Sequence, residues 1–326
     1  MRDALARLLR EKDVVVADGA MGTSLLRLGI AAGECGELWN VDHSERVAGV
    51  HQGFVDAGSD IILTNTFGAN RFHLGSFGLA ARTGEINRAG AAVARGVADR
   101  AGRLVAVAGS MGPTGGLLQP MGKRSVAEAE EAFFEQAEAL REGGVDVAWI
   151  ETVFADNELD AAISAAVRAG LPYVATMTFD RGGRTMMGGR PEDEMRRIRK
   201  AAEKPLAFGA NCGAGPAQML DSVIGLVRGA EGEIPVVAKS NCGLPVVGPD
   251  MKTSYNGTPE IMADYACMAR DAGARIIGGC CGTTAEHVAA MAEALARRPR
   301  GEPPSYEEIA RRLGPVKDSG RPNVKA

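Results

Sequence analysis

The sequence predicts an α/β protein folded as a single (β/α)8 TIM barrel with a short C-terminal appendage. Short runs of branched aliphatic residues alternate eight times with longer helical patterns, which is typical of a parallel sheet covered by helices. At 326 residues the chain is long enough for such a barrel, which commonly needs about 250 residues. A polar or reactive residue follows each of the eight runs, as expected at the carboxyl ends of barrel strands.

The expected strands are short and largely apolar. They cover residues 14–17, 61–63, 104–108, 145–150, 173–177, 205–208, 234–238 and 274–277. An open doubly wound sheet is the alternative, but no dinucleotide-type glycine fingerprint follows the first strand. The closed barrel is therefore the preferred interpretation.

The expected helices lie between these strands, at 44–57, 85–100, 125–142, 156–169, 191–202, 216–228, 258–272 and 284–297. Ser125 and Glu128 form a capping-box pattern, Asp156 is the expected cap of its helix, and Pro259 suits a first helical turn. Segments 187–191 and 243–257 should overhang the strand ends. We expect the barrel to occupy residues 1–297 and a tail, partly helical or disordered, to occupy residues 298–326, with a short helix near 306–313.

The overall composition excludes several classes of partner. The net charge of -4 gives no electrostatic footprint for nucleic acid. No apolar run approaches the roughly 20 residues that span a bilayer, and the N-terminus lacks the apolar core of a signal peptide. We therefore expect a cytoplasmic protein with small-molecule substrates and no nucleic-acid or membrane partner; a homo-oligomer is compatible with the sequence. In that compartment the six cysteines are interpreted as thiols or metal ligands, not as disulfides.

Three cysteines occupy glycine-rich segments after two of the expected strands. Cys280 and Cys281 lie in the segment 278–282, and Cys212 lies in the similar segment 209–213. The sixth and eighth strands of a barrel are close enough for these thiols to meet across the mouth. Soft thiolates select zinc, and three protein ligands with an open fourth position are typical of a catalytic zinc site. Buried free cysteines without a metal are the alternative.

Asp18 and Glu151 are the carboxylates expected at the same mouth. Two anions beside a glycine-containing loop suit the α-amino group of an amino acid, and the amides of Asp18, Gly19 and Ala20 suit its carboxylate. For Asp18, capping of a following helix is an equal alternative. Thr66, after the second strand, is also expected at the mouth.

Four further features leave more than one interpretation open. The ring of Trp39 could form a cation–π wall for a quaternary ammonium group, and packing within a lid is an equal alternative. Cys242 could add a fourth metal ligand, although a small loop residue is preferred. Lys239 could form a Schiff base in a lyase, or pair with a neighbouring carboxylate. Cys35 and Cys267 are interpreted as structural, and the four histidines, all in helical or connecting stretches, are not ligand candidates.

These residues resemble the homocysteine S-methyltransferase family. The family motifs occur here as Asp18-Gly19-Ala20-Met21-Gly22-Thr23, Gly209-Ala210-Asn211-Cys212 and Gly278-Gly279-Cys280-Cys281-Gly282. The similarity runs from about Asp13 to Leu295. Within the family, the chain is most similar to the short bacterial betaine–homocysteine methyltransferases, through the segments 37–42, 184–188 and 255–259. Two positions depart from the animal betaine enzymes, which carry tyrosine where this chain has Gly68 and Thr152.

The resemblance implies a barrel with Zn2+ on Cys212, Cys280 and Cys281. It also implies homocysteine held through Asp18 and Glu151, with Trp39 near the methyl donor. The expected reaction moves a methyl group from a small cationic donor to the homocysteine thiolate and gives methionine. Betaine is the first donor candidate, S-methylmethionine or another sulfonium the second, and a methyl-corrinoid partner the third. A non-catalytic zinc- or thiol-binding barrel is the alternative from a different class.

Overall fold

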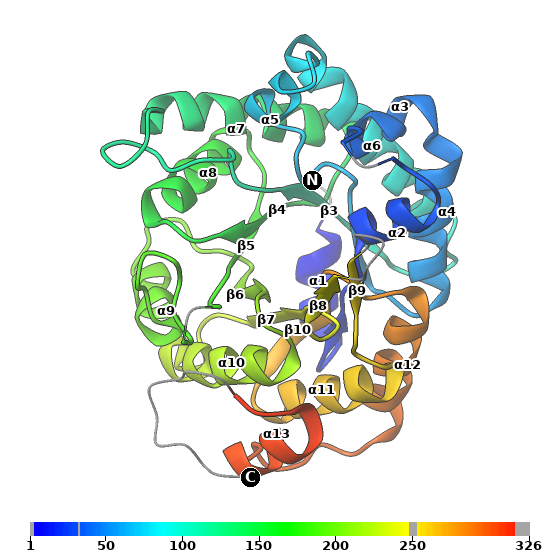
Figure 1. The fold of residues 1–326 in the computed structure, drawn as a ribbon, viewed down its shortest axis with the longest axis vertical. Coiled ribbons are helices and arrows are strands. Elements are labelled where there is room, and N and C mark those ends of the chain that lie inside the picture. The colour runs from blue at the N-terminus through cyan, green and yellow to red at the C-terminus, as the bar shows by residue number, and fades with distance from the viewer. Residues whose placement is uncertain (1–2, 32, 181, 248–252, 317–326) are drawn as a thin grey trace.

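The computed structural model describes residues 3–31, 33–180, 182–247 and 253–316. Eight parallel strands form a barrel in the order β1-β10-β7-β6-β5-β4-β3-β2 (Figure 1). A parallel bridge between Ala17 and Ile61 joins the two edge strands and nearly closes the barrel. The predicted (β/α)8 TIM barrel is therefore confirmed. Its strands are β1 (Val15–Val16), β2 (Ile61–Leu63), β3 (Ala106–Met111), β4 (Val147–Val153), β5 (Tyr173–Met177), β6 (Ala207–Cys212), β7 (Val236–Ser240) and β10 (Ala274–Gly279).

Most of these strands extend further toward their carboxyl ends than the apolar runs predict. Glu151 lies within β4, Cys212 is the last residue of β6, and Lys239 lies within β7. Polar side chains do not end these strands, because the parallel backbone ladder continues past them, as in the pairing of Asn211 with Lys239. These three side chains are therefore held on sheet backbone, which fixes them more firmly than a loop does.

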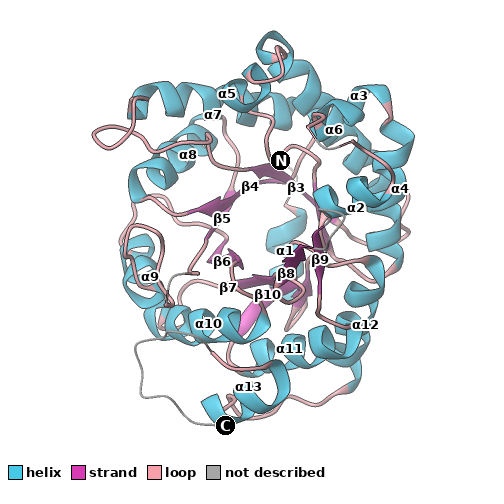
Figure 2. Cartoon of the chain, in the orientation of Figure 1, coloured by secondary structure: helices cyan, strands magenta, loops and turns pink. Residues whose placement is uncertain are grey.

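The expected helices surround the sheet (Figure 2). Ser125 and Glu128 form the predicted capping box, and Pro259 stands at the first turn of its helix. The expected capping role of Asp156 is wrong: Asp156 is the first helical residue, and the cap position belongs to Ala155, whose backbone is extended. The bounds are α4 (Ser44–Asp56), α6 (Thr83–Asp99), α7 (Val126–Gly143), α8 (Asp156–Arg168), α9 (Pro191–Arg199), α10 (Pro216–Ala230), α11 (Pro259–Asp271) and α12 (Ala285–Arg297).

Several short elements were not predicted. The expected loop 243–257 contains an antiparallel hairpin, β8 (Pro245–Val247) with β9 (Thr253–Tyr255). Within this loop, residues 248–252 lie outside the described residues. The other additions are helical: α1 (Ala4–Glu11), α2 (Met21–Arg27), α3 (Trp39–Asp42), α5 (Arg71–Gly75), and the 3-10 turns η1 (Gly36–Leu38) and η2 (Ala80–Arg82).

Helix α1 closes the amino-terminal end of the barrel. Leu5 and Leu8 are buried in the same cluster as the inward-facing Val15, Ile61 and Trp149. Figure 1 shows α1 in the middle of the ring of strands. With this end plugged by apolar side chains, access to the barrel is left at the carboxyl ends of the strands.

The segment after α12 continues into a short helix, α13 (Tyr306–Leu313), where a helix was expected. Ile309 is fully buried, the Tyr306 hydroxyl donates to Asp221 of α10, and Arg312 pairs with Asp264 of α11. The part of the expected tail from residue 317 onward lies outside the described residues. Among the described helices, none has both the length and the apolar composition needed to cross a membrane.

Candidate active site at the barrel mouth

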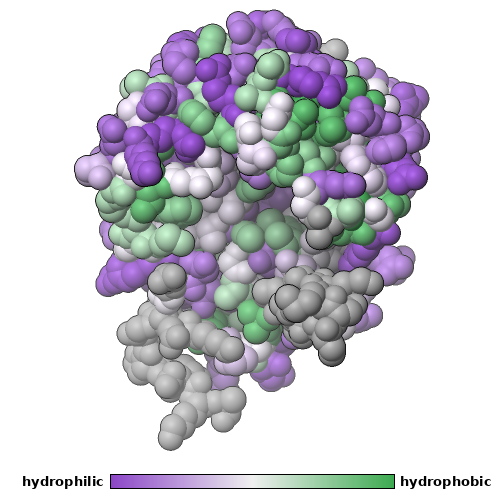
Figure 3. All heavy atoms as spheres, turned by 45° about the horizontal axis from the view of Figure 1, so that its top comes forward, coloured by the Kyte–Doolittle hydropathy of each residue, from purple (hydrophilic) through white to green (hydrophobic). Residues whose placement is uncertain are grey.

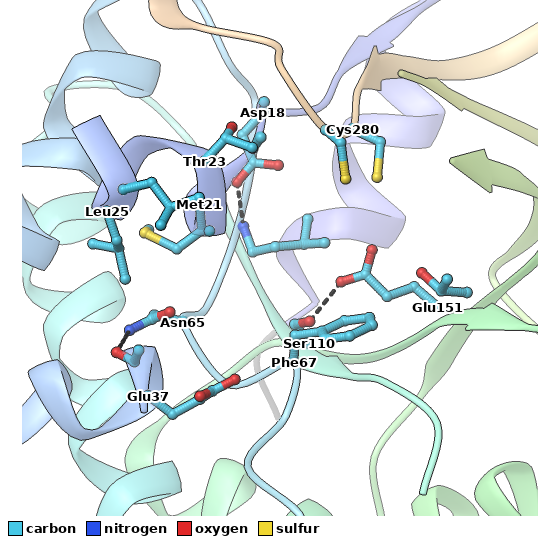
Figure 4. Close-up of a pocket in the computed structure, with 18 of the residues that line it drawn as sticks. Asp18, Met21, Thr23, Leu25, Glu37, Asn65, Phe67, Ser110, Glu151 and Cys280 are labelled. Atoms are coloured by element: carbon cyan, nitrogen blue, oxygen red, sulfur yellow. Dashed lines mark hydrogen bonds between the residues drawn. The ribbon is translucent and has the colours of Figure 1, made fainter. Parts of the chain in front are cut away.

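A cavity of about 440 Å3 opens at the carboxyl ends of the strands. Figure 3 shows a hollow near the middle of the molecule, with apolar side chains around it. The wall on the barrel side is polar and sulfur-rich, and the wall formed by α2 and the segment after it is mostly apolar. The residues that carry the argument below are Asp18, Glu37, Phe67, Ser110, Glu151, Cys212, Lys239, Cys280 and Cys281, most of them drawn in Figure 4.

The structure brings Cys212, Cys280 and Cys281 together. Their three sulfur atoms all lie within 4.8 Å of one another, close enough to bind one metal ion together. The turn after Cys281 requires a glycine: Gly282 has a φ of 82°, and the Tyr255 ring occupies the space that a side chain there would need. The tight turn lets two consecutive sulfurs face one point, which a regular strand would not allow.

Cys212 has a backbone conformation that side chains rarely adopt, with a φ of 64°. Thr152 of β4, which β5 separates from β6 in the sheet, has the same φ of 64°. Asn211, the residue before Cys212, links Thr152 to the cluster: its Oδ1 accepts from Thr152 N at 2.8 Å, and its Nδ2 donates to Thr152 Oγ1 at 2.8 Å and toward Cys280 Sγ at 3.8 Å. Strain of this kind is held only where surrounding contacts fix it, as at functional sites.

The donor set fits a soft or borderline divalent metal ion. The hydrogen bond with Cys280 lowers the pKa of Cys212, but the hydrogen bond with Cys281 and burial outweigh it and raise that pKa to about 11. In the same way, the hydrogen bond with Cys212 lowers the pKa of Cys281, whereas the hydrogen bond with Cys280 and burial raise it to about 12. Three neighbouring sulfurs thus resist ionising beside one another without a cation. A bound divalent ion reverses this preference because it stabilises the thiolates.

The other cysteines lie outside this cluster. Cys242 is buried, and its thiol donates to the Gly257 carbonyl at 3.3 Å. Its backbone amide donates to the Cys281 carbonyl at 2.9 Å, so it supports the turn without joining the sulfurs. Cys35 and Cys267 are buried among apolar neighbours, in agreement with a structural interpretation.

Asp18 does not present a free carboxylate to the cavity. Its Oδ1 lies 2.7 Å from Lys239 Nζ, and its Oδ2 accepts from Leu63 N at 2.7 Å. Burial alone would lower the pKa of Lys239, but the carboxylates of Asp18 and Glu151 outweigh it and raise that pKa. The structure therefore shows the second interpretation of Lys239, in which it pairs with a neighbouring carboxylate. The capping interpretation of Asp18 is wrong, since the cap position of α2 is Ala20.

Glu151 is the carboxylate that remains available. Its Oε1 accepts from Ser110 Oγ at 2.5 Å, and its Oε2 has no hydrogen-bond partner among the described residues. Burial raises the pKa of Glu151, while Lys239 and Ser110 oppose the shift. A carboxylate in this position can accept hydrogen bonds from a substrate ammonium group.

Gly19 lies where no other residue fits. A Cβ there would stand 2.6 Å from the Thr283 carbonyl oxygen and 2.7 Å from the Phe54 ring. The amide of Ala20 donates to Thr283 O at 3.0 Å, so it is not free for a substrate carboxylate. The proposed role of this loop in carboxylate binding therefore falls on Gly19 and the backbone at the start of α2, which also line the cavity.

Neither Trp39 nor Thr66 is brought to the cavity surface. Trp39 is buried with Leu25 and Ile30, and its ring meets His43 edge-on, with the Arg46 guanidinium 5.2 Å from the ring centroid. This is the lid-packing alternative. Thr66 is fully buried and donates to the Ser110 carbonyl at 2.7 Å, so it supports the wall from behind.

Four residues to which the sequence assigned no role shape the site. Asn211 precedes Cys212 in the glycine-containing motif, and Ser110 lies just past the third predicted strand, so position alone could have indicated both. Asn241 fixes the turn, because its Oδ1 accepts from Cys281 N at 3.0 Å. Glu37 lines the cavity from a segment whose course the sequence did not reveal.

Comparison with known proteins agrees with this geometry. The family model for homocysteine S-methyltransferase matches residues 15–295. The methionine synthase of Mycobacterium tuberculosis is 35% identical over 308 residues, which cover 89% of this chain but 25% of that protein. The methionine synthase of Mycobacterium leprae is 32% identical over 313 residues, with the same coverage of 89% and 25%. The chain thus spans about a quarter of the length of these relatives.

Among solved structures, the metallated form of the homocysteine methyltransferase MmuM from Escherichia coli has the same fold, with a TM-score of 0.72 and 24% identity over 89% of this chain and 99% of that one. Its oxidized form gives a TM-score of 0.71 and 25% identity over 88% and 98%. The family match covers nearly the whole barrel, including all three clustered cysteines. This chain belongs to the homocysteine S-methyltransferase family.

Proposed function

We propose that this protein is a zinc-dependent methyltransferase that moves a methyl group from a small cationic donor, with betaine as the first candidate, to homocysteine. The observation that carries the proposal is the cluster of three sulfurs at the inner end of a cavity, in a chain of this family. Cys212, Cys280 and Cys281 would hold the metal. When bound there, zinc would supply a positive charge that favours the thiolate form of a substrate thiol at neutral pH.

The chain's own residues would orient homocysteine. Glu151 is buried beside the sulfurs and would accept hydrogen bonds from the α-ammonium group. The Gly19 loop would face the α-carboxylate with backbone amides. Lys239 would hold Asp18 in place beneath the substrate, so that the inner end of the cavity presents one unpaired carboxylate, Glu151, and not two.

The transfer itself balances without an oxidant or a further reactant. The homocysteine sulfur lone pair forms a new S–CH3 bond while the donor's C–N bond breaks, and the electron pair of that bond remains on nitrogen. The positive charge on the donor nitrogen and the negative charge on the sulfur both disappear, which leaves a neutral amine and a neutral thioether. Such charge loss is favoured where water is excluded. The apolar side chains of Met21, Leu25 and Ile30, which line the cavity, would help to exclude water from it.

The test is a donor panel on purified protein whose zinc content is measured on the same sample. Betaine, S-methylmethionine and a methyl-corrinoid protein would each be offered with homocysteine, and methionine would be quantified. We expect methionine with betaine at a rate that follows zinc content. If only S-methylmethionine or only the methyl-corrinoid protein yields methionine, that compound replaces betaine as the proposed donor and homocysteine remains the acceptor. No methionine with any donor, despite full zinc loading, would favour the non-catalytic zinc-binding alternative.

A further inference from the structure

The outer end of the cavity carries a carboxylate that the reaction at the sulfurs does not use. Glu37, in the turn η1, lines the cavity together with Phe67 from the segment after β2. Figure 4 shows the Glu37 side chain at the end of the cavity away from Cys280. The Asp18–Lys239 pair and Glu151 belong to the inner end, so Glu37 contributes a separate negative charge.

The carboxylate of Glu37 is held in a fixed position. Its Oε1 accepts from the Gly68 amide at 2.8 Å, and its Oε2 accepts from the Cys35 thiol at 3.5 Å. Burial and the neighbouring Glu37 charge raise the pKa of Cys35 to about 11, so the thiol remains a donor. No lysine or arginine within the described ranges forms an ion pair with Glu37.

Glycine at position 68 makes room for this carboxylate. A Cβ there would lie 2.6 Å from Glu37 Oε1 and would also overlap the His73 ring. The segment that carries Glu37 is fastened to the end of β2: Asn65 Nδ2 donates to the Gly36 carbonyl at 2.8 Å, and Asn40 Nδ2 donates to the Asn65 carbonyl at 2.8 Å. The negative charge is therefore preorganised before any ligand arrives.

Phe67 and the apolar wall complete the surroundings. The Phe67 side chain is 42% exposed, and its ring lies where a side chain at Gly112 would have to stand, 2.6 Å from a Cβ built there. Across the cavity are Leu25 and Ile30 from α2 and the segment after it. An apolar wall, an accessible aromatic ring and an anion without a basic partner match a methylated onium group, which is bulky, apolar in outline and positively charged.

We propose that Glu37 is a specificity-determining residue that selects a positively charged methyl donor over a neutral one of the same shape. This inference rests on the proposed function for the identity of the site, but it concerns ligand charge and not methyl transfer. Glu37 acts through its charge, and Phe67 adds the attraction of its ring face. Glu34, which also lines the cavity but is exposed and accepts from the Ala31 amide, does not share this role.

The test compares two ligands that differ only in charge at one atom. Betaine and 3,3-dimethylbutanoate carry the same carboxylate, and the second replaces the ammonium nitrogen by carbon. Their dissociation constants would be measured by calorimetry at about pH 8, where an ordinary histidine is neutral, on zinc-loaded protein without homocysteine, so that no methyl transfer accompanies binding. We expect the wild-type protein to prefer betaine. Glu37→Gln, which keeps an acceptor for the Gly68 amide, should reduce that preference about tenfold.

Two further variants sharpen the outcome. Glu34→Gln removes a neighbouring charge and should leave the preference unchanged, and Phe67→Leu keeps an apolar surface and should lower the preference. A wild-type protein without preference for betaine would overturn the inference, as would an unchanged preference in Glu37→Gln, whatever Phe67→Leu shows. If the preference depends on Glu37 but no cationic donor yields methionine, the inference stands and the proposed function fails.

Discussion

The ammonium nitrogen of Lys239 lies 2.7 Å from Oδ1 of Asp18, and both side chains are buried at the base of the cavity. The two residues lie on β7 and just after β1, which are separated in the barrel by β10. The pair fixes the loop after β1 and leaves Glu151 as the carboxylate for a substrate ammonium group. Asp18, which the sequence predicted as a substrate ligand, is therefore held by an ion pair with Lys239 within the protein.

Replacing Lys239 by Met should destabilise the protein by about 3–5 kcal/mol, because the buried Asp18 carboxylate loses its counter-charge. The double variant Asp18→Asn with Lys239→Met should recover much of this loss, since no unpaired charge remains. Urea unfolding of the wild type, both single variants and the double variant measures the coupling. Additive losses would show that the two side chains do not depend on each other.

Replacing Cys280 by Ala should abolish zinc binding and methyl transfer while the barrel still folds. The variant keeps only two of the three sulfur donors, and without the metal ion these two thiols return to the protonated state. Metal content by mass spectrometry and far-UV circular dichroism separate loss of the site from loss of the fold. Cys242→Ala is the matched control, because its thiol bonds to Gly257 and lies outside the cluster. Full zinc content in Cys280→Ala, or normal activity in metal-stripped protein, would contradict the assignment.

The parts of the site that sequence predicted are those carried by local motifs. Cys212, Cys280 and Cys281 follow apolar runs, and strand order alone brings such positions to one mouth. The Asp18–Lys239 pair needed side-chain reach across the barrel interior, which no local pattern encodes.

The segment between β1 and α4 shows a different limit. Trp39 was predicted at the donor site, but the residue two positions earlier, Glu37, is the one that lines the cavity. The rotation of a short turn decides which side chain faces inward, and here the Asn40–Asn65 amide contacts set that rotation. The fold shows the same contrast: eight strands followed from hydrophobic alternation, whereas α1 was missed because its burial depends on the barrel it plugs.

Homocysteine recognition should depend on pH through Glu151. Burial raises the pKa of this carboxyl group, so its ionised form, which binds the ammonium, is lost on acidification at a higher pH than for an ordinary glutamate. We expect kcat/KM for homocysteine to fall on the acid side, and Glu151→Gln to be weakly active without that acid limb. Ser110→Ala removes the hydrogen bond that favours the ionised form and should move the limb to higher pH. An acid limb that persists unchanged in Glu151→Gln would assign it to another group.

His51 should make the stability of the whole barrel depend on pH. Its imidazole is fully buried in α4 without a hydrogen-bond partner among the described residues, and burial lowers its pKa to about 4. The unfolded chain, with a histidine pKa near 6.5, binds a proton that the folded chain resists between these two values. The free energy of unfolding therefore rises with pH across that window, and the contribution of His51 is lost as the pH falls.

The comparison with His51→Leu isolates this effect from that of the carboxyl groups. Between about pH 7.5 and pH 5 the wild type should lose about 2 kcal/mol more than the variant, which has no imidazole to protonate. Urea unfolding at both pH values measures the difference. His73→Leu, at an exposed position of α5, is the control for removing an imidazole at the surface. Equal losses in the wild type and His51→Leu would mean that the buried ring gains its proton without unfolding, through local opening of α4.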